Sequence, residues 1–416
     1  MELKKYKLGE VCTIIPGYAF KSSDFGCGKN WVIKIKDIAP PAINIATADK
    51  VAVTPSNKYK LSKGDYVMAM TGATIGKVGM LQTNISNVFI NQRVCKFVPN
   101  EHICDKTYLY YVLSTQSFKN FIFNNIDSKL AQPNIGHPTI YKYSHLFPNC
   151  IKEQKLIASV LHNLDCKIAL NHAINDNLEA MAKQLYDYWF VQFDFPNEDG
   201  KPYKSSGGTM VWNEKLKREI PSSFEVVNMG KLCDFRNGIN YSKDETGNDY
   251  QIVNVRNISS SRILLDGEDF DVITVPTSKA GNYVLKPDDI IIARSGCPGS
   301  TRLLLSPANT LFCGFIICCS PNDSRMRNYL VYCLKQLEGT NATTSGGSIL
   351  QNVSQDTLKG LHVIVPEKQI IDKFNKTIEL IFARMLNCLK ESKALTKQRN
   401  ELLPLLMNGQ ASINSD

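Results

Sequence analysis

A heptad repeat of apolar residues is the feature that most limits how this chain can fold. Alternate steps of four and three residues from Ile157 stay uncharged as far as Trp189, about five heptads without proline or glycine. A second run steps in the same way from Ile371 to Leu402. The apolar seam positions are Ile157, Leu161, Leu164, Ile168, Leu178 and Leu185 in the first run, and Ile371, Phe374, Ile378, Ile381, Met385, Leu395 and Leu402 in the second.

Each run predicts a helical rod roughly 50 Å long, because an α-helix rises 1.5 Å per residue. The second rod should end before Pro404, because proline disfavours helical geometry in the residue before it. Either rod alone could be a core helix of a large domain. Two matched seams, each after a segment of similar length, favour an antiparallel pair in which Asn171 and Asn175 could set the register.

The segments that precede the two rods resemble each other at a spacing of 220 to 224 residues. The matched pairs are residues 8–12 and 229–233, each with a glycine five residues on (Gly17 and Gly238), then 32–38 and 252–258, and 61–67 and 285–291. The matched segments alternate apolar and polar residues or form short β-branched runs, which is typical of strands. The chain is therefore predicted to be an internal duplication.

We expect an α+β fold in which two similar mixed α/β domains, related by a pseudo-two-fold axis, are separated by two long antiparallel coiled-coil helices. The predicted boundaries are residues 1–150 for the first domain, 151–192 for the first rod, 193–220 for an irregular connector, 221–366 for the second domain, 367–408 for the second rod and 409–416 for a tail.

Composition indicates a soluble globular protein of 416 residues, 43% of them hydrophobic. Its N-terminal segment lacks the apolar core of a signal peptide, no apolar run is long enough to span a membrane, and 13 cysteines occur without a C-x-x-C pair. We therefore expect a cytoplasmic location. Residues 1–150 hold 18 Lys and Arg against nine Asp and Glu, whereas residues 221–366 hold 13 against 14. A polyanion would meet the stronger positive field at the first domain, although a solvated basic face is an equally common explanation.

Each domain carries a glycine-rich loop after a predicted strand, at residues 70–77 and 294–302. Glycines would let backbone amides approach a phosphate, and the flanking side chains would add donors; a tight turn is the alternative. Asn and Gln suit adenine edges and Arg suits guanine, although Gln132 and Gln351 could instead cap turns. The candidate DNA contacts are Lys34, Lys36, Thr71, Gly72, Thr74, Gly76, Lys77, Asn91, Gln92, Arg93, Gln132 and Asn134 in the first domain, and Asn254, Arg256, Asn257, Arg294, Ser295, Gly296, Arg302, Gln351 and Asn352 in the second.

Catalytic motifs are nearly absent from the sequence. It lacks Walker A, G-x-S-x-G, H-E-x-x-H and the Asn-Pro-Pro-aromatic motif of amino-group methyltransferases. His162, Cys166 and His172 could form a zinc site on the first rod, but three such groups on a rod surface usually face solvent, and we predict no metal. Acidic residues at 266–269 suggest either a nuclease cluster or a turn.

The whole arrangement resembles the DNA specificity (S) subunit of type I restriction-modification systems. The resemblance rests on residues 7–11, 71–76, 131–135, 189–195, 200–208 and 402–409. The second domain departs from it at residues 295–299 and by lacking a proline beside Asn352. The resemblance implies a non-catalytic subunit with two target recognition domains, each reading half of a bipartite site in double-stranded DNA. It also implies spacers that hold two methyltransferase (M) subunits, and a possible restriction/translocase (R) subunit.

By the same resemblance this chain binds no cofactor itself, and S-adenosylmethionine, ATP and Mg²⁺ belong to its partners. Two other functions remain open from the residues alone: a structural coiled-coil adaptor, or a self-contained duplicated nuclease using acidic residues near Asp266.

Overall fold

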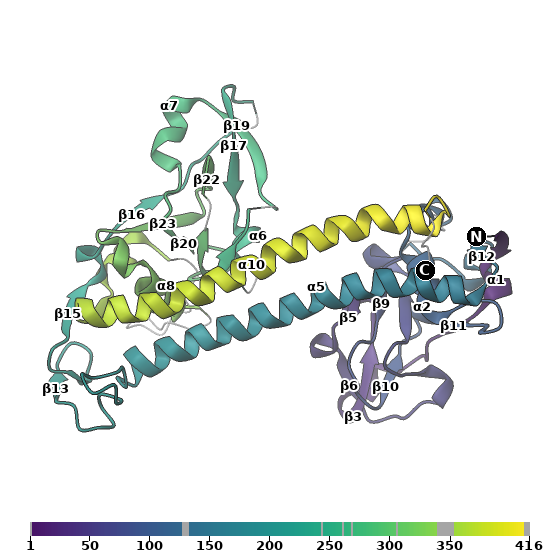
Figure 1. Cartoon of the computed structure of the whole chain (residues 1–416), viewed down its shortest axis with the longest axis horizontal. Helices are drawn as coiled ribbons and strands as arrows, with labels where there is room; N and C mark the ends of the chain where they lie inside the picture. The colour runs from purple at the N-terminus through teal and green to yellow at the C-terminus, as the bar shows by residue number, and fades with distance from the viewer. Residues whose placement is uncertain are drawn as a thin grey trace. The chain divides into compact units, whose positions relative to one another are not determined.

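The structure is a computed structural model that describes residues 2–126, 133–242, 244–259, 262–267, 269–304, 307–338 and 353–411. The chain divides into two compact units (Figure 1). Unit 1 comprises Met1–Ile168 and Lys393–Asp416, and unit 2 comprises Ala169–Ser392. Each unit holds a mixed α/β body together with part of both long helices, so the predicted fold class, a duplicated α+β chain with long helices, is confirmed. In the described residues, no helix is long and apolar enough to cross a membrane.

The two heptad runs form the longest helices, α5 (Ile151–Tyr186) and α10 (Lys368–Met407), and α5 continues into a π-helical turn, η6 (Asp187–Val191). Every predicted seam position is buried or half-buried. Within unit 2 the helices run antiparallel, because Asn171 on α5 donates to Glu391 at 2.9 Å while Trp189, farther along α5, packs on Phe374.

Helix α10 does not stop before Pro404, so that prediction is wrong. Proline removes one donor from the helix, but its own carbonyl accepts from the Asn408 amide at 3.0 Å and the helical path continues. Leu406 and Met407 are buried in the core of unit 1. We attribute the extra turn to this burial, which offsets the missing hydrogen bond.

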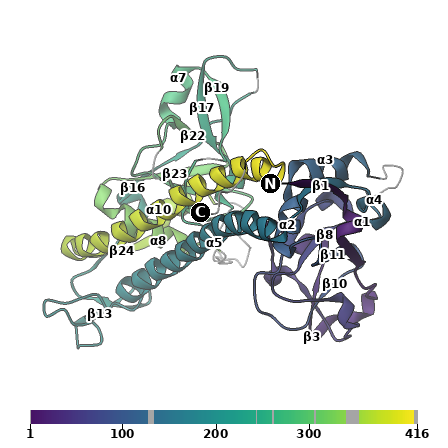
Figure 2. The ribbon, with the colours of Figure 1, turned by 45° about the vertical axis from the view of Figure 1, so that its right-hand side comes forward.

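Unit 1 is built on a six-stranded and a four-stranded sheet. The first has the order β2 (Cys12–Pro16), β11 (Val94–Pro99), β8 (Tyr66–Ala69), β9 (Val78–Met80), β5 (Ala42–Ile43), β4 (Ile38–Ala39), and the second β6 (Asp49–Val51), β3 (Phe25–Ile33), β10 (Val88–Ile90), β7 (Lys60–Leu61). The remaining elements are β1 (Leu3–Lys7) paired with β12 (Ser144–Pro148), α1 (Leu8–Val11), α2 (Lys106–Ser114), α3 (Gln116–Asn124) and α4 (His137–Ile140). Within this unit α2 and α3 lie at one end and β3 and β10 at the other (Figure 2).

Unit 2 repeats this topology with fewer strands. Its five-stranded sheet has the order β16 (Cys233–Asn237), β23 (Ile316–Pro321), β20 (Ile290–Ala293), β21 (Thr301–Leu304), β18 (Leu264–Leu265), and its three-stranded sheet β19 (Asp271–Val275), β17 (Asn248–Val253), β22 (Thr310–Phe312). It also contains β15 (Glu225–Asn228) paired with β24 (His362–Val365), α6 (Val255–Ile258), α7 (Thr277–Ala280), α8 (Arg327–Lys335) and α9 (Gln355–Gly360).

Matching backbone contacts show that the two units are structural repeats. Leu8 donates its amide to the Tyr143 carbonyl and Met229 to the Leu361 carbonyl, each at 2.8 Å. A Cβ added to Gly17 or to Gly238 would lie 2.1 Å from a carbonyl oxygen of the neighbouring strand. Both glycines are therefore required for the same close approach of two backbones.

Two details of the sequence prediction are wrong. The connector predicted to be irregular contains the hairpin β13 (Met210–Asn213) and β14 (Arg218–Pro221), closed by Lys217 at a φ of +49°. Segments 34–37 and 254–258, predicted to continue strands, instead leave the sheets as short helical turns. Asp37 accepts the Lys34 amide and Asn257 accepts the Asn254 amide, each at 2.8 Å, so a side chain ends the strand in both units.

Candidate nucleic-acid interface

The capped turn after β3 holds two of the predicted lysines. The Lys34 ammonium lies 2.7 Å from the Asp49 carboxylate and 3.7 Å from the centre of the Phe25 ring. Lys36 donates to the Thr47 carbonyl at 2.6 Å and contacts the same carboxylate at 3.3 Å. The hydrogen bond from Lys34 is the main cause of the lowered pKa of Asp49. Lys36 also lies 3.8 Å from the buried Asp37 carboxylate, so two lysines face two carboxylates in this turn.

The matching turn in unit 2 has a single cation, Arg256, in place of the two lysines. Asn254 donates to Asp271 at 2.8 Å, and the exposed Arg256 guanidinium forms an ion pair with the same carboxylate. Asn257 caps the turn and donates its amide group to the Asp269 carbonyl at 2.9 Å, which gives it a structural role. Arg256, Asn257 and Arg262 line one hollow of about 620 Å³ in this unit.

The glycine-rich loops are closed turns whose principal amides are already bonded. Ala69 donates to the Lys77 carbonyl at 3.0 Å and accepts from Gly76 at 2.9 Å. Ala293 makes the same two bonds with Ser300 and Gly299, each at 2.9 Å. The Gly72 amide donates to the Pro133 carbonyl at 2.9 Å, so the amides of Gly72 and Gly76 are occupied and cannot cradle a phosphate as predicted.

Positive backbone φ angles account for these glycines. Gly72, Gly76, Gly296 and Gly299 have φ of +75°, +78°, +78° and +83°. Other residues adopt such angles at a cost, so the turn alternative explains the glycines without a ligand. The side chain of Lys77 is nevertheless exposed, and that of Ser295 is partly exposed.

Each unit has an exposed arginine at a backbone hydrogen bond that occurs in both units. In unit 1 the Met70 amide donates to the Arg93 carbonyl, and in unit 2 the Arg294 amide donates to the Phe315 carbonyl, each at 2.9 Å. The arginine therefore supplies the carbonyl of this hydrogen bond in unit 1 and the amide in unit 2. Within the described part of the chain, neither guanidinium has a hydrogen bond or ion pair, and both side chains are exposed.

Several other candidates lie near these contacts or outside the described residues. The Met70 carbonyl accepts from Ile135 at 3.0 Å and the Arg294 carbonyl from Val353 at 2.9 Å, which places Asn134 beside the first loop. Asn91 is partly buried and Gln92 is exposed. Gln132, Gln351 and Asn352 fall outside the described residues, as does part of the acidic segment 266–269.

Arg302 does not offer its charge to a ligand. Its side chain is only 3% exposed and forms an ion pair with Glu338, and its guanidinium also donates to the Thr301 carbonyl at 2.7 Å. Strand β21 holds it inside the protein, a placement that the basic character of the loop sequence could not reveal.

Phe315 is a residue that the sequence reasoning missed. Its side chain is 63% exposed beside Arg294, at the end of a turn that precedes β23. An aromatic residue directly after Gly314, between two apolar strands, was the available signal. An exposed aromatic next to an unpaired arginine suits a surface that meets bases.

The described residues give no further support to the zinc site on the first rod or to the nuclease cluster at residues 266–269. His162 and Cys166 are 3.4 Å apart, but no group of three His, Cys, Asp or Glu side chains able to hold a metal occurs in the described part of the chain. Gly267, next to Asp266, has a φ of +84°, a backbone angle typical of a glycine in a turn.

Known proteins resemble this chain over nearly its full length. The family described as "Type I restriction modification DNA specificity domain" matches it twice, at residues 1–180 and 221–403. The type I restriction enzyme MjaIX specificity subunit of Methanocaldococcus jannaschii is 23% identical, over 95% of this chain and 96% of that protein. The HindI specificity subunit of Haemophilus influenzae is 24% identical, over 98% and 99%.

A solved structure shares the fold. The crystal structure of the type I restriction-modification S subunit from M. genitalium matches with a TM-score of 0.59 at 16% identity, covering 99% of this chain and 97% of that one. With the double family match, this agrees with the duplicated topology. The chain belongs to the family of type I restriction-modification DNA specificity subunits.

Proposed function

We propose that this DNA specificity subunit reads a bipartite site in double-stranded DNA, one half with each unit, and that its long helices hold two methyltransferase subunits. The observation that carries the proposal is the repeat itself. One backbone contact recurs in both units and presents an exposed arginine in each, Arg93 in unit 1 and Arg294 in unit 2.

The two arginines suit base readout in the major groove. A guanidinium can donate two parallel hydrogen bonds to guanine, and an arginine with no intramolecular partner loses no ion pair when it binds. In unit 2 the neighbouring Phe315 adds an apolar group that fits a thymine methyl. The units would thus read different bases with arginines that lie on opposite sides of the shared backbone contact.

Phosphate contacts would position each unit on the duplex. Lys77, Gln92 and the partly neutralised pair Lys34 and Lys36 supply donors in unit 1. Such contacts fix orientation without carrying sequence information. Because residues 1–150 hold twice as many basic as acidic residues, unit 1 should contribute more of the salt-dependent affinity.

The outer faces of the helices in unit 2 suit a protein partner. Leu170 and Met181 on α5 are 59% and 55% exposed and lie three turns apart on one face, and Leu380 on α10 is 69% exposed. Exposed apolar residues on helices that already bury a seam indicate an interaction site. We assign these faces to the methyltransferase subunits, which would bring S-adenosylmethionine, while ATP and Mg²⁺ would accompany a restriction/translocase subunit.

Domain exchange tests the proposal. The chain is purified with a methyltransferase subunit of its own system, and the adenines methylated in cellular DNA are sequenced. Replacing residues 221–366 with the matching segment of a relative should change one half of the methylated site and leave the other half intact. A methylated site without two separate conserved halves, or an exchange that changes both halves, would contradict it.

The purified chain alone separates the remaining alternatives. Cutting or methylation of DNA by this chain alone with Mg²⁺ and S-adenosylmethionine would favour a self-contained enzyme. Failure to bind DNA even with its methyltransferase partner would favour a structural adaptor.

A further inference from the structure

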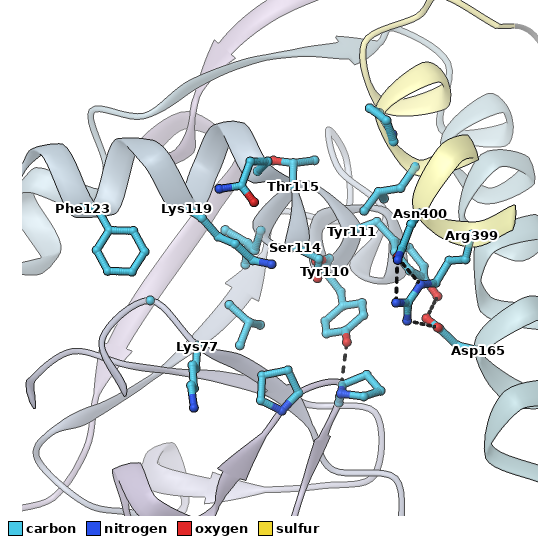
Figure 3. A pocket seen from close by; sticks show the side chains of 18 of the residues that line it. Lys77, Tyr110, Tyr111, Ser114, Thr115, Lys119, Phe123, Asp165, Arg399 and Asn400 are labelled. Atoms are coloured by element: carbon cyan, nitrogen blue, oxygen red, sulfur yellow. Dashed lines mark hydrogen bonds and ion pairs between the residues drawn. The ribbon is translucent and has the colours of Figure 1, made fainter. Parts of the chain in front are cut away.

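Unit 1 contains an open cavity of about 660 Å³ for which the DNA-reading role has no use. Its walls come from α2, α3, the loop between β8 and β9, the Pro40–Pro41 turn, α5 and the last turns of α10 (Figure 3). Phe123, which is 58% exposed, supplies aromatic surface, the buried rings of Tyr110 and Tyr111 lie behind the lining, and Leu403 and Pro404 supply aliphatic surface. A cavity of this size with mainly apolar walls is large enough for a ligand or a partner side chain.

The equivalent place in unit 2 is filled by aromatic side chains. The ends of α5 and α10 align without gaps at a spacing of 214 residues, which pairs Tyr186 with Asn400, Trp189 with Leu403 and Phe190 with Pro404. Small or aliphatic residues therefore line the cavity of unit 1 where large aromatics stand in unit 2.

These aromatics are packed into the core of unit 2. Tyr186 stacks on Tyr332 with ring centres 5.5 Å apart, and Phe190 meets the edge of Tyr329 at 4.8 Å. Tyr332 occupies the position of Tyr111 on the matching helix, 221 residues later. Unit 1 thus keeps the tyrosine wall that receives an aromatic ring in unit 2, but its own α10 supplies no ring.

The charges around the cavity fit an acidic occupant. Lys119 extends from α3 toward the middle of the cavity, between Phe123 and Tyr110, whereas Lys77, on the loop across from α3, directs its ammonium away from that helix (Figure 3). Neither ammonium has an ion pair or hydrogen bond within the described residues.

At the opposite end of the cavity the charged side chains are paired with each other. Asp165 accepts from Tyr111 at 2.7 Å and from Arg399 at 2.8 Å, so its charge is matched by that arginine. Arg399 also donates to the Asn400 side chain at 2.9 Å. Lys119 is therefore the charge at the cavity that is left to meet an occupant.

We infer that this cavity receives an aromatic side chain carried by an acidic segment of a partner protein. A protein is favoured over a nucleotide because unit 2 fills the same site with protein aromatics from a helix. The inference concerns a surface apart from Arg93 and Arg294, so it stands or fails independently of how DNA is read.

Short peptides test the inference on the full chain. The probes are acetyl-Asp-Glu-Trp-Glu-Asp-amide, the same peptide with alanine in place of tryptophan, and one with lysine in place of every acidic residue. Binding is followed by saturation-transfer NMR. The acidic tryptophan peptide should bind, and each altered peptide should bind about tenfold more weakly.

Two variants locate the binding. Asn400→Tyr with Pro404→Phe gives unit 1 the aromatics of unit 2 and should weaken binding of the tryptophan peptide about tenfold, with Val272→Tyr on the exposed face of β19 as the control. Lys119→Glu changes only an exposed side chain, so it keeps the fold and should also weaken binding. Failure of the tryptophan peptide to bind, binding unaffected by Lys119→Glu, or equal competition by deoxyadenosine monophosphate would overturn the inference.

Discussion

Each unit buries one aspartate at the start of a central strand, but the two aspartates have different partners. Asp65 accepts the Ser62 amide at 2.9 Å, and Asp289 accepts the Lys286 amide at 2.8 Å, so the backbone contact is the same. Asp289 also forms an ion pair with Arg236 and accepts a hydrogen bond from Ser320.

The cations come from different elements. Asp65 is held by Lys96 on β11 at 3.0 Å and by Lys106 on α2 at 2.6 Å. In unit 2 the residue that corresponds to Lys96 is the buried Cys318, so the cation comes instead from Arg236 on β16, and Ser320 also donates to Asp289 at 2.5 Å.

The difference shows that the carboxylate is fixed and its partner is replaceable. A buried carboxylate needs a cation close by, and any neighbouring strand or helix can supply it. The exposed arginines follow the same rule, because Arg93 and Arg294 stand on opposite sides of one backbone contact. After the duplication, each unit therefore keeps a cation at the same place in the fold, although the residue that supplies it differs between the units.

The largest expected effect comes from removing the more deeply buried aspartate. Asp289→Ala should destabilise unit 2 by about 3–5 kcal/mol, because it leaves Arg236, whose side chain is 29% exposed, without its carboxylate. Asp65→Ala should cost less: although Lys96 is only 16% exposed, its flexible side chain keeps a hydrogen bond to the Lys60 carbonyl at 3.0 Å, and Lys106 is 38% exposed and can be hydrated. Hydrogen exchange of β20 and β8 measures the two effects separately, and equal losses of protection would contradict the comparison.

His145 should make unit 1 sensitive to acid, whereas unit 2 has Val363 at the matching position. Burial lowers the pKa of His145 from 6.5 to about 4, so between these values the unfolded chain binds a proton that the folded chain refuses. Stability should therefore fall as the pH falls from 6.5 to 4, by roughly 3 kcal/mol at most.

The substitution His145→Val tests this directly, because it gives unit 1 the residue of unit 2. The melting temperature of the variant should change less than that of the parent chain between pH 7 and pH 4.5. Parallel curves for the two proteins would show that other groups cause the acid sensitivity.

Arg294→Ala should cost about 1–3 kcal/mol of DNA affinity and relax one half-site only, because one bidentate contact to guanine is lost. Arg93→Ala should relax the other half-site by a similar amount. Binding is measured on DNA libraries randomised in each half at fixed salt. If either variant weakens all sequences alike and lowers the salt dependence, that arginine contacts phosphate.

Arg256→Ala should have the smallest effect, below about 1 kcal/mol on DNA affinity. Its exposed guanidinium already has Asp271 as a partner, so binding DNA would require that ion pair to break. The same libraries provide the measurement. A loss as large as that of Arg294→Ala would place Arg256 among the base-reading residues.

The sequence predicted the long helices well because a heptad pattern is local. Ile157, Leu161 and their partners repeat at a spacing that only a helix places on one face. The duplication was also visible in the sequence, since Gly17 and Gly238 recur at matching positions where a Cβ would collide with a backbone oxygen.

Features that depend on distant contacts could not be predicted in this way. Helix α10 extends beyond Pro404 because Leu406 and Met407 are buried, and Arg302 is buried because it forms an ion pair with Glu338. Arg93 and Arg294 occupy opposite partners of the same backbone hydrogen bond in the two units. This relation is visible only in the structure, because the bonded residues are far apart in the sequence. Local composition could name candidate residues for the proposed interface but could not show which of them already have a partner within the protein.

The closed glycine loops have a consequence for how this protein can diversify. The loop of unit 1 is one residue longer than that of unit 2, yet both end in the same two hydrogen bonds to Ala69 or Ala293. A residue can therefore be inserted or deleted at the loop tip while the register of the sheet below is preserved. Evolution could alter the target sequence by such indels, and laboratory libraries that vary loop length at residues 70–75 or 294–298 should still yield folded proteins.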